Sequence, residues 1–176
     1  MAHVEENRLA AARIDVGGVG RANVATGVPV LDHLLALLAE RAGFDLALEV
    51  APGSAEAELA AAGRGLGTAL RQPLRTAGAR GFGAATAPAE EALATVALER
   101  SERPLLASNV DFSRERVGGL EGDLVSQFLG RLADGAGLTL HVRLVEGQDR
   151  QHVLEAIFKA LGTALGEACR AAPGKE

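Results

Sequence analysis

Residues 151–165 read QHVLEAIFKALGTAL, and this stretch decides the fold because its amphipathic pattern recurs elsewhere in the chain. In a helix, apolar side chains at i, i+3, i+4, i+7 and i+11 share one face, here formed by Leu154, Ile157, Phe158, Leu161 and Leu165. The opposite face carries His152, Glu155 and Lys159, about one turn apart. The pattern predicts a helix that packs on one side and presents reactive groups on the other.

A second stretch, residues 56–70, repeats the packing side of this helix. Residues 66–70 read LGTAL, identical to residues 161–165, which lie 95 positions later. The positions that correspond to His152, Glu155 and Lys159 hold Ala57, Ala60 and Arg64. The pattern indicates an internal duplication that kept the apolar face and changed the polar face.

We expect each half to follow the order strand, strand, helix, strand, helix. In residues 1–78, strands are predicted at 9–16, 21–26 and 44–50, with helices from Pro29 to Gly43 and from Ser54 to the bend or end at Pro73. In residues 79–176, strands are predicted at 93–100, 105–111 and 138–145, with helices at 123–134 and from residue 151. Residues 17–20 are interpreted as a hairpin turn, residues 76–87 as a linker, residues 101–104 as a turn and residues 112–122 as a loop.

Two small sheets, each with a helical face, bury those faces best against each other. The sequence therefore predicts an α+β fold in which two sheets enclose a layer of four helices. At 176 residues, the chain is long enough to bury a real core.

Composition narrows the possible classes of protein. No apolar run approaches the ~20 residues that cross a bilayer, and the N-terminus MAHVEENRL has no signal-peptide pattern, so a cytoplasmic location is expected. The net charge is −5, with no Trp or Tyr, which disfavours nucleic-acid binding. The single cysteine, Cys169, excludes an internal disulfide and is expected to be a small buried residue.

Three sets of residues are candidates for metal binding, phosphate binding or catalysis: the pair His152 and Glu155, Lys159, and His33. His152 and Glu155 are three residues apart on a helix and can hold one cation together, while Lys159 adds a charge suited to phosphate. All three are equally compatible with an ordinary solvated helix face. His33 on its own helix is, by itself, more typical of a structural histidine.

Several motifs resemble one enzyme family in order and spacing. Residues 26–35 (TGVPVLDHLL) with residues 43–45 (GFD) are similar to TGxxFLDHML…GxFD of imidazoleglycerol-phosphate dehydratase. Residues 88–94 (PAEEALA), 101–104 (SERP) and 151–160 (QHVLEAIFKA) resemble its PMDEALA, SGRP and HHxxEAxFKA motifs. The resemblance covers about residues 9–170.

The resemblance implies a tandem-repeat fold of the ribosomal protein S5 domain 2-like type and assembly from trimers into a 24-subunit shell. It also implies a role in histidine biosynthesis and two manganese ions at sites between subunits. In such enzymes a carbon-bound proton and a hydroxyl leave imidazoleglycerol phosphate. Two cations on the ring nitrogens stabilise the anionic imidazolate, and carboxylate or imidazole bases move the protons.

Carried over residue by residue, the resemblance assigns a reduced metal site. His33, His152 and Glu155 match ligands, and Glu56 keeps one possible donor. Positions that hold ligands or related donors in the family are Asn7, Arg41, Ala57, Ala60, Gln127 and Gln151 here. Glu91 and Glu155 match the catalytic carboxylates, with Glu90 beside Glu91 in place of Asp.

The phosphate contacts are reduced too. Arg103 and Lys159 match family phosphate contacts, whereas the arginine of the RYG motif falls at Gly81, next to Arg80. The C-terminal PSTKG motif is missing, and the chain ends with residues 173–176, PGKE.

Three hypotheses follow. The main expectation is a homologue without dimanganese chemistry, which binds a phosphorylated small molecule through Arg103 and Lys159 or serves as a structural or regulatory partner of a true dehydratase. The alternative is a working dehydratase with a reduced metal site. A third is a different enzyme built on the same scaffold from His33, His152, Glu155, Glu56 and Glu91. A homo-oligomer, a trimer or a 24-mer, is expected in each case.

Overall fold

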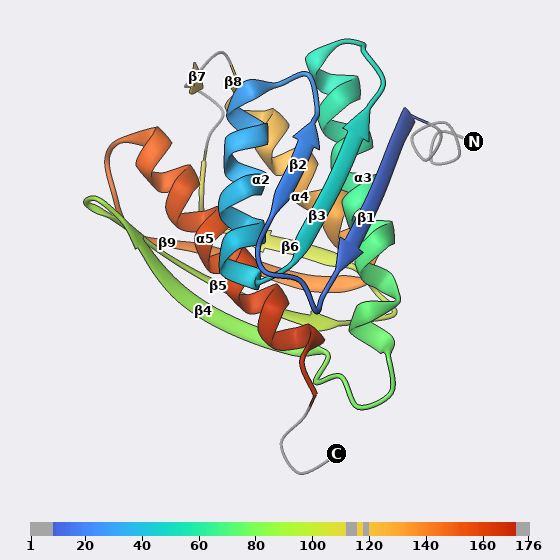
Figure 1. The fold of residues 1–176 in the computed structure, drawn as a ribbon. Coiled ribbons are helices and arrows are strands. Elements are labelled where there is room, and N and C mark those ends of the chain that lie inside the picture. The colour runs from blue at the N-terminus through green and yellow to red at the C-terminus, as the bar shows by residue number, and fades with distance from the viewer. Residues whose placement is uncertain (1–8, 112–115, 118–119, 172–176) are drawn as a thin grey trace.

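The structure is a computed structural model that describes residues 9–111, 116–117 and 120–171. In the first half the elements are β1 (Ala10–Asp15), β2 (Ala22–Ala25), α2 (Pro29–Ala42), β3 (Asp45–Val50), α3 (Ala55–Arg71) and the short 3-10 helix η1 (Pro73–Arg75). In the second half they are β4 (Phe82–Ala89), β5 (Ala92–Arg100), β6 (Leu105–Ser108), β7 (Arg116–Val117), β8 (Leu120–Glu121), α4 (Gly122–Ala136), β9 (Leu138–Glu146) and α5 (Arg150–Cys169). The predicted boundary between residues 78 and 79 falls in the connection from η1 to β4 (Figure 1).

The elements form the predicted α+β sandwich. Helices α2 and α3 pack on the three-stranded sheet β1-β3-β2, and α4 and α5 pack on the four-stranded sheet β4-β5-β9-β6. The helices lie between the two sheets, where α2 packs against α5 and α3 packs against α4 (Figure 1). The duplicated fold of two sheets around four helices is therefore confirmed.

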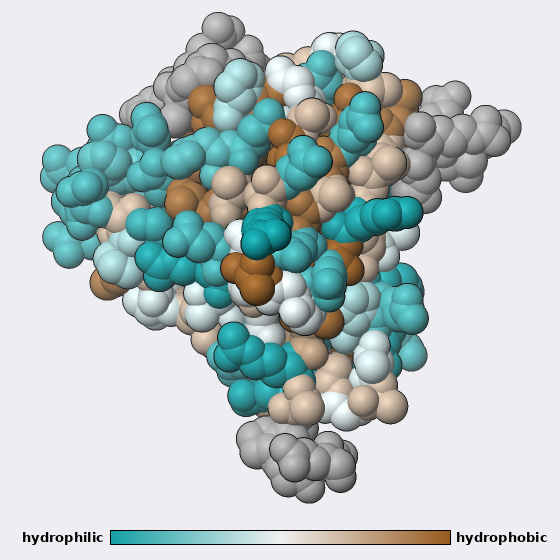
Figure 2. All heavy atoms as spheres, viewed as in Figure 1, coloured by the Kyte–Doolittle hydropathy of each residue, from teal (hydrophilic) through white to brown (hydrophobic). Residues whose placement is uncertain are grey.

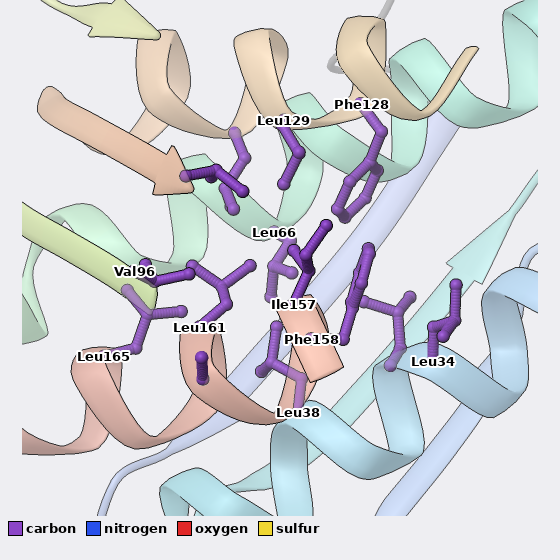
Figure 3. Packing of buried hydrophobic residues seen from close by; sticks show 14 of the residues in the cluster. Leu34, Leu38, Leu66, Val96, Phe128, Leu129, Ile157, Phe158, Leu161 and Leu165 are labelled. Atoms are coloured by element: carbon purple, nitrogen blue, oxygen red, sulfur yellow. The ribbon is translucent and has the colours of Figure 1, made fainter. Parts of the chain in front are cut away.

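One apolar core fills the helical layer. All five residues predicted for the apolar face of α5 are buried: Leu154, Ile157, Phe158, Leu161 and Leu165. Figure 3 shows Ile157, Phe158 and Leu161 among side chains from α2, α3 and α4, and the rings of Phe128 and Phe158 stack with centroids 5.7 Å apart. Each fully buried side chain of this size contributes about 1.5–3 kcal/mol, so this face anchors α5 and leaves its other side for chemistry.

The predicted hairpin at residues 17–20 is wrong in its pairing. Strand β1 pairs antiparallel with β3, and β2 pairs parallel with β3, so β3 lies between the two strands that the turn connects. The turn at residues 101–104 likewise joins β5 to β6, which both pair with β9 rather than with each other. The reason is hydrophobic: Leu46, Leu48 and Val50 make β3 the most apolar strand of its sheet, which favours the central position.

The predicted linker at residues 76–87 is also wrong in part, because residues 82–89 form β4. This strand is composed almost entirely of small residues, and it buries Gly83, Ala87 and Ala89 against α5. It is an edge strand that pairs only with β5, which is why it tolerates Pro88. The second half therefore has one strand more than the first at the start of its repeat.

The helices end where the local chemistry predicts. Pro29 is the first residue of α2, and Gly43 closes that helix in the left-handed conformation with φ of 73°. Ser54 caps α3 by accepting a hydrogen bond from the Ala57 N–H, and Asp149 caps α5. The predicted loop at residues 112–122 contains the short β7–β8 pair, and its residues 112–115 and 118–119 lie outside the described chain.

The repeated LGTAL segments bring helices unusually close. A Cβ on Gly67 would lie 2.6 Å from the carbonyl oxygen of Leu132 on α4, and a Cβ on Gly162 would overlap the backbone of Leu38 on α2. Helices can approach this closely only where the contacting residue has no side chain. The duplication therefore preserved the close contact of each helix pair.

One face of the molecule mixes polar and apolar side chains. Figure 2 shows the face in front of the first sheet, where hydrophilic side chains are mixed with small residues and several strongly hydrophobic ones. Among the described residues, the exposed large hydrophobic side chains are Leu9, Val16, Val19, Phe82, Leu105 and Val145. None of the described helices has the length and apolar character of a membrane-crossing segment.

Candidate active site

The N-terminal end of α5 gathers the histidines and carboxylates that the sequence singled out. Asp149 caps this helix, and its carboxylate accepts hydrogen bonds from the N–H groups of Gln151 and His152. This cap fixes the first turn, so that His152 and Glu155 project from the side of α5 that the core leaves uncovered. Both side chains are partly exposed.

His152 is bonded to Glu91, which comes from the tight turn between β4 and β5. The Oε2 atom of Glu91 lies 2.7 Å from Nδ1 of His152. Its Oε1 atom accepts hydrogen bonds from the backbone N–H of Asp149 at 2.8 Å and from that of Gln148 at 3.4 Å. Glu90, beside it in the turn, has a φ of 50°, a left-handed conformation that this two-residue connection requires.

These contacts shift the titration of both groups. The hydrogen bond from the Asp149 amide, followed by that from His152, lowers the pKa of Glu91 to about 2. The hydrogen bond to Glu91 raises the pKa of His152 above its ordinary value. Glu91 therefore stays a carboxylate and favours a proton on the imidazole beside it.

A second histidine–carboxylate pair joins the two halves of the chain. Nε2 of His33 on α2 lies 3.0 Å from Oε1 of Glu155 on α5. His33 also borders a shallow cavity of about 220 Å³, whose lining residues are Pro29, Val30, His33, Leu34, Gln151 and Leu154. The helix contact between α2 and α5 thus brings His33 to the same helix as His152, although 119 residues separate them in the chain.

The arrangement is suited to moving protons. An imidazole held by a carboxylate can take up a proton on its free nitrogen and return it, and the carboxylate stabilises the charged ring. The structure provides two such pairs at one end of α5, one to Glu91 and one to Glu155.

The same residues do not form a dimanganese centre within one chain. Among the residues that the structure describes, no three His, Cys, Asp or Glu side chains converge as a group that could hold a metal ion. Glu56 is exposed in the first turn of α3, Ala60 is buried in the core, and Gln127 is exposed on α4. The described donors of one chain therefore do not by themselves make up the ligand set of a pair of manganese ions.

The predicted phosphate residues contact different partners in one chain. Arg103 is exposed in the loop between β5 and β6, where its backbone N–H donates a hydrogen bond to the Ser101 hydroxyl. Lys159 donates to the carbonyl oxygen of Pro88 at 3.3 Å. Arg80 pairs with Glu167 at 3.3 Å and lies over the ring of Phe82, near the C-terminal end of α5.

Sequence reasoning missed the loop that positions Glu91. The backbone N–H groups of Gln148 and Asp149 hold its carboxylate, and Asp149 also caps α5. The available signal was an aspartate just before the start of the helical pattern, which is a common N-cap.

Comparison with known proteins identifies the family. The family model described as imidazoleglycerol-phosphate dehydratase matches residues 26–165. The chain belongs to the imidazoleglycerol-phosphate dehydratase family. The match includes His33, Glu91, His152 and Glu155.

Individual relatives of this dehydratase family span nearly the whole chain. The chain is 37% identical over 162 residues to the imidazoleglycerol-phosphate dehydratase of Acetivibrio thermocellus, covering 89% of this chain and 83% of that protein. It is 41% identical over 163 residues to that of Desulforudis audaxviator, covering 90% and 83%. The crystal structure of the dehydratase from Staphylococcus aureus superposes with a TM-score of 0.84 at 32% identity, covering 93% of this chain and 95% of that one.

Proposed function

We propose that this chain dehydrates imidazoleglycerol phosphate to imidazole-acetol phosphate and water, using a reduced set of metal-binding residues. The observation that carries the proposal is the presence of two histidine–carboxylate pairs at the N-terminal end of α5. Its similarity to relatives named as dehydratases, at 37% and 41% identity, also favours this function over the non-catalytic one expected from the sequence.

In the proposed reaction, the substrate loses a carbon-bound proton and a hydroxyl group. The Glu91 carboxylate accepts a hydrogen bond from Nδ1–H of His152, so that Nε2 is the nitrogen free to take the proton from carbon. The His33–Glu155 pair supplies the proton with which the hydroxyl leaves as water. The resulting enol becomes the ketone when His152 returns its proton to carbon and the enol hydroxyl gives its proton back to the His33–Glu155 pair, so that the atoms balance and both pairs are restored without any oxidant.

A second candidate function is a non-catalytic homologue that binds a phosphorylated small molecule. A specific observation favours it: Ala57, Ala60, Gln127 and Gln151 stand where the family places ligands or related donors. Even changes around metal ligands cost about 10–100-fold in metal affinity or activity, so the loss of ligands themselves should cost more. Such a homologue would keep Arg103 and Lys159 as anion contacts.

One assay separates the two candidates. The purified chain is incubated with imidazoleglycerol phosphate, with added manganese or with a chelator, and imidazole-acetol phosphate is measured alongside bound metal by elemental analysis. We expect turnover that His152→Ala reduces by about 10²–10⁴-fold, because a proton-transferring group is removed. His141→Ala is the matched control, since His141 is exposed on β9 outside the site, and it should leave turnover unchanged.

Two results would reject the dehydratase. The first is no product under either metal condition, and the second is equal loss of turnover in the two histidine variants. Saturable substrate binding without product would then establish the non-catalytic candidate.

We also propose that the chain forms a homo-oligomer, built on trimers as the family resemblance implies. In one chain Arg103, Lys159 and Arg80 bond different partners. Contacts between copies would bring these side chains from different subunits to one phosphate group.

A further inference from the structure

An open, arginine-lined hollow on the surface at the C-terminal end of α3 is separate from the candidate active site. Its volume is about 580 Å³, and it is lined by Thr68, Arg71, Gln72, Arg75 and Thr76. Every lining side chain carries a hydrogen-bonding group, two carry a full positive charge and none is a carboxylate. None of these residues was assigned to phosphate or metal by the family resemblance.

The position of the hollow follows from the bonds of Arg75. Its Nη1 atom donates to the carbonyl oxygen of Ala136 at 2.7 Å, and Nη2 donates to that of Gly137 at 3.0 Å. Gly137 immediately precedes β9, whose nine residues end before the loop that holds Glu91. At roughly 3.3 Å per residue, the length of β9 puts about 30 Å between the hollow and that loop.

The arginines around the hollow cap the C-terminal end of α4. Their positive charge exceeds the negative partial charge of that helix end. Helix α4 has no basic residue in its own last turn. Arg75 bonds its final carbonyls, and Arg71 Nη1 lies 3.4 Å from the carbonyl oxygen of Gly135. A helix C-terminus carries only about half a negative charge, so two guanidinium groups leave most of their charge uncompensated.

A third arginine adds to this excess. Arg100 approaches from β5, with Nη1 3.5 Å from the carbonyl oxygen of Leu74. Burial lowers the pKa of the Arg75 guanidinium, and the charges of Arg71 and Arg100 lower it further. The described hydrogen bonds of all three side chains go to main-chain carbonyls, which neutralise none of them.

We propose that this hollow binds a small phosphate-class anion, either inorganic phosphate or a phosphate monoester. Guanidinium groups match the oxygens of such an anion in pairs, and each of these charge-assisted bonds is stronger than a neutral one. Thr68 and Gln72 add neutral hydrogen-bonding groups at the wall. The proposal does not depend on turnover or on metal.

The test is calorimetric titration of the intact chain with inorganic phosphate in a phosphate-free buffer at constant ionic strength. We expect saturable binding that Arg71→Gln weakens at least about tenfold, because one charged hydrogen-bonding partner is lost. Arg75→Gln should weaken it too, but it removes two short hydrogen bonds at the end of α4, whereas Arg71→Gln removes a single one of 3.4 Å. Arg71→Gln is therefore the decisive variant. Glycerol phosphate in place of inorganic phosphate distinguishes the two sources of the anion.

Two control variants separate this hollow from general surface charge and from the candidate active site. Arg143→Gln removes an exposed arginine on β9 and should leave phosphate binding unchanged. Lys159→Gln removes the phosphate contact assigned to the candidate active site. Phosphate should still bind to the hollow in this variant. Circular dichroism verifies that each variant is folded.

Four outcomes would overturn the proposal. They are the absence of saturable binding, equal weakening in Arg71→Gln and Arg143→Gln, full binding in Arg71→Gln, and loss of all binding in Lys159→Gln alone. A change of oligomeric state in Arg71→Gln without phosphate binding would instead assign the hollow to an acidic side chain of a second copy.

Discussion

At the scale of single residues, the sequence located His152 and Glu155 but not the bond that controls His152. Spacing within one helix predicts which side chains share a face, and in the structure both of these side chains are partly exposed on α5. It contains no information on a contact such as that from His152 to Glu91, which spans two elements 61 residues apart. That bond depends on where the β4–β5 turn meets the start of α5.

This bond makes a prediction for titration. In Glu91→Gln the pKa of His152 should fall towards its ordinary value of about 6.5, because the carboxylate that favours the imidazolium is gone. Titration of the imidazole resonances by NMR measures the change. Asp149→Ala should lower the pKa as well, because it removes a negative charge that favours the imidazolium, whereas Ser54→Ala removes the neutral cap of α3 and should not. An unchanged His152 pKa in Glu91→Gln would contradict the assignment.

The same pair predicts a pH window for stability. The pKa of Glu91 is depressed to about 2 in the folded chain, so its stabilising contribution is present above its unfolded pKa of about 4.5 and is lost as pH falls towards 2. The pKa of His152 is raised, so its contribution is present below about 6.5 and is lost as pH rises through the folded-state value. Urea unfolding of wild type and Glu91→Gln should therefore differ most between about pH 4.5 and 6.5, and a difference independent of pH would refute the link.

At the scale of elements, amphipathic period and capping residues predicted all four helices and the order of most strands. Two interpretations failed for physical reasons. Strand β4 was not predicted, because its alanine and glycine residues have low strand propensity and give no alternation of apolar and polar side chains. Strand pairing was misjudged because a turn of suitable length does not determine which strands become neighbours once an apolar strand can enter between them.

The close helix contacts give a prediction at this scale. Gly162→Ala should destabilise the fold by about 1–3 kcal/mol, because the new methyl group meets the backbone of Leu38. Gly130→Ala on α4 is the matched control, since a Cβ at this position would meet nothing within 4 Å, and it should stabilise by up to about 1 kcal/mol through helix propensity. Chemical denaturation measures both, and equal effects would show that the α2–α5 contact can relax.

At the scale of the whole molecule, the fold was predictable because the duplication doubled the pattern from which it was inferred. The candidate site was predictable only in part. The residues near the start of α5 come together in one chain, whereas Arg103, Lys159 and Arg80 do not. Contacts between copies leave no periodic signature in a single sequence, so reasoning from the residues could not place these three.

The proposed assembly can be measured directly. We expect sedimentation to show a trimer in the presence of a chelator and a larger shell only if manganese binds, because the family resemblance places metals between subunits. A monomer at micromolar concentration would contradict the oligomer, and a 24-mer in the chelator would show that metal is not needed to close the shell.

The pairing of α2 with α5 and of α3 with α4 has a consequence for the history of the chain. Exchanging the two halves turns one helix pair into the other, so an approximate two-fold axis passes through the helical layer. An ancestor of half the length would have formed an isologous dimer through this surface. In a fused chain the two halves need not be identical, and here the LGTAL packing segment is the same in both. One descendant half could keep His152 and Glu155 while the other replaced their counterparts with Ala57 and Ala60.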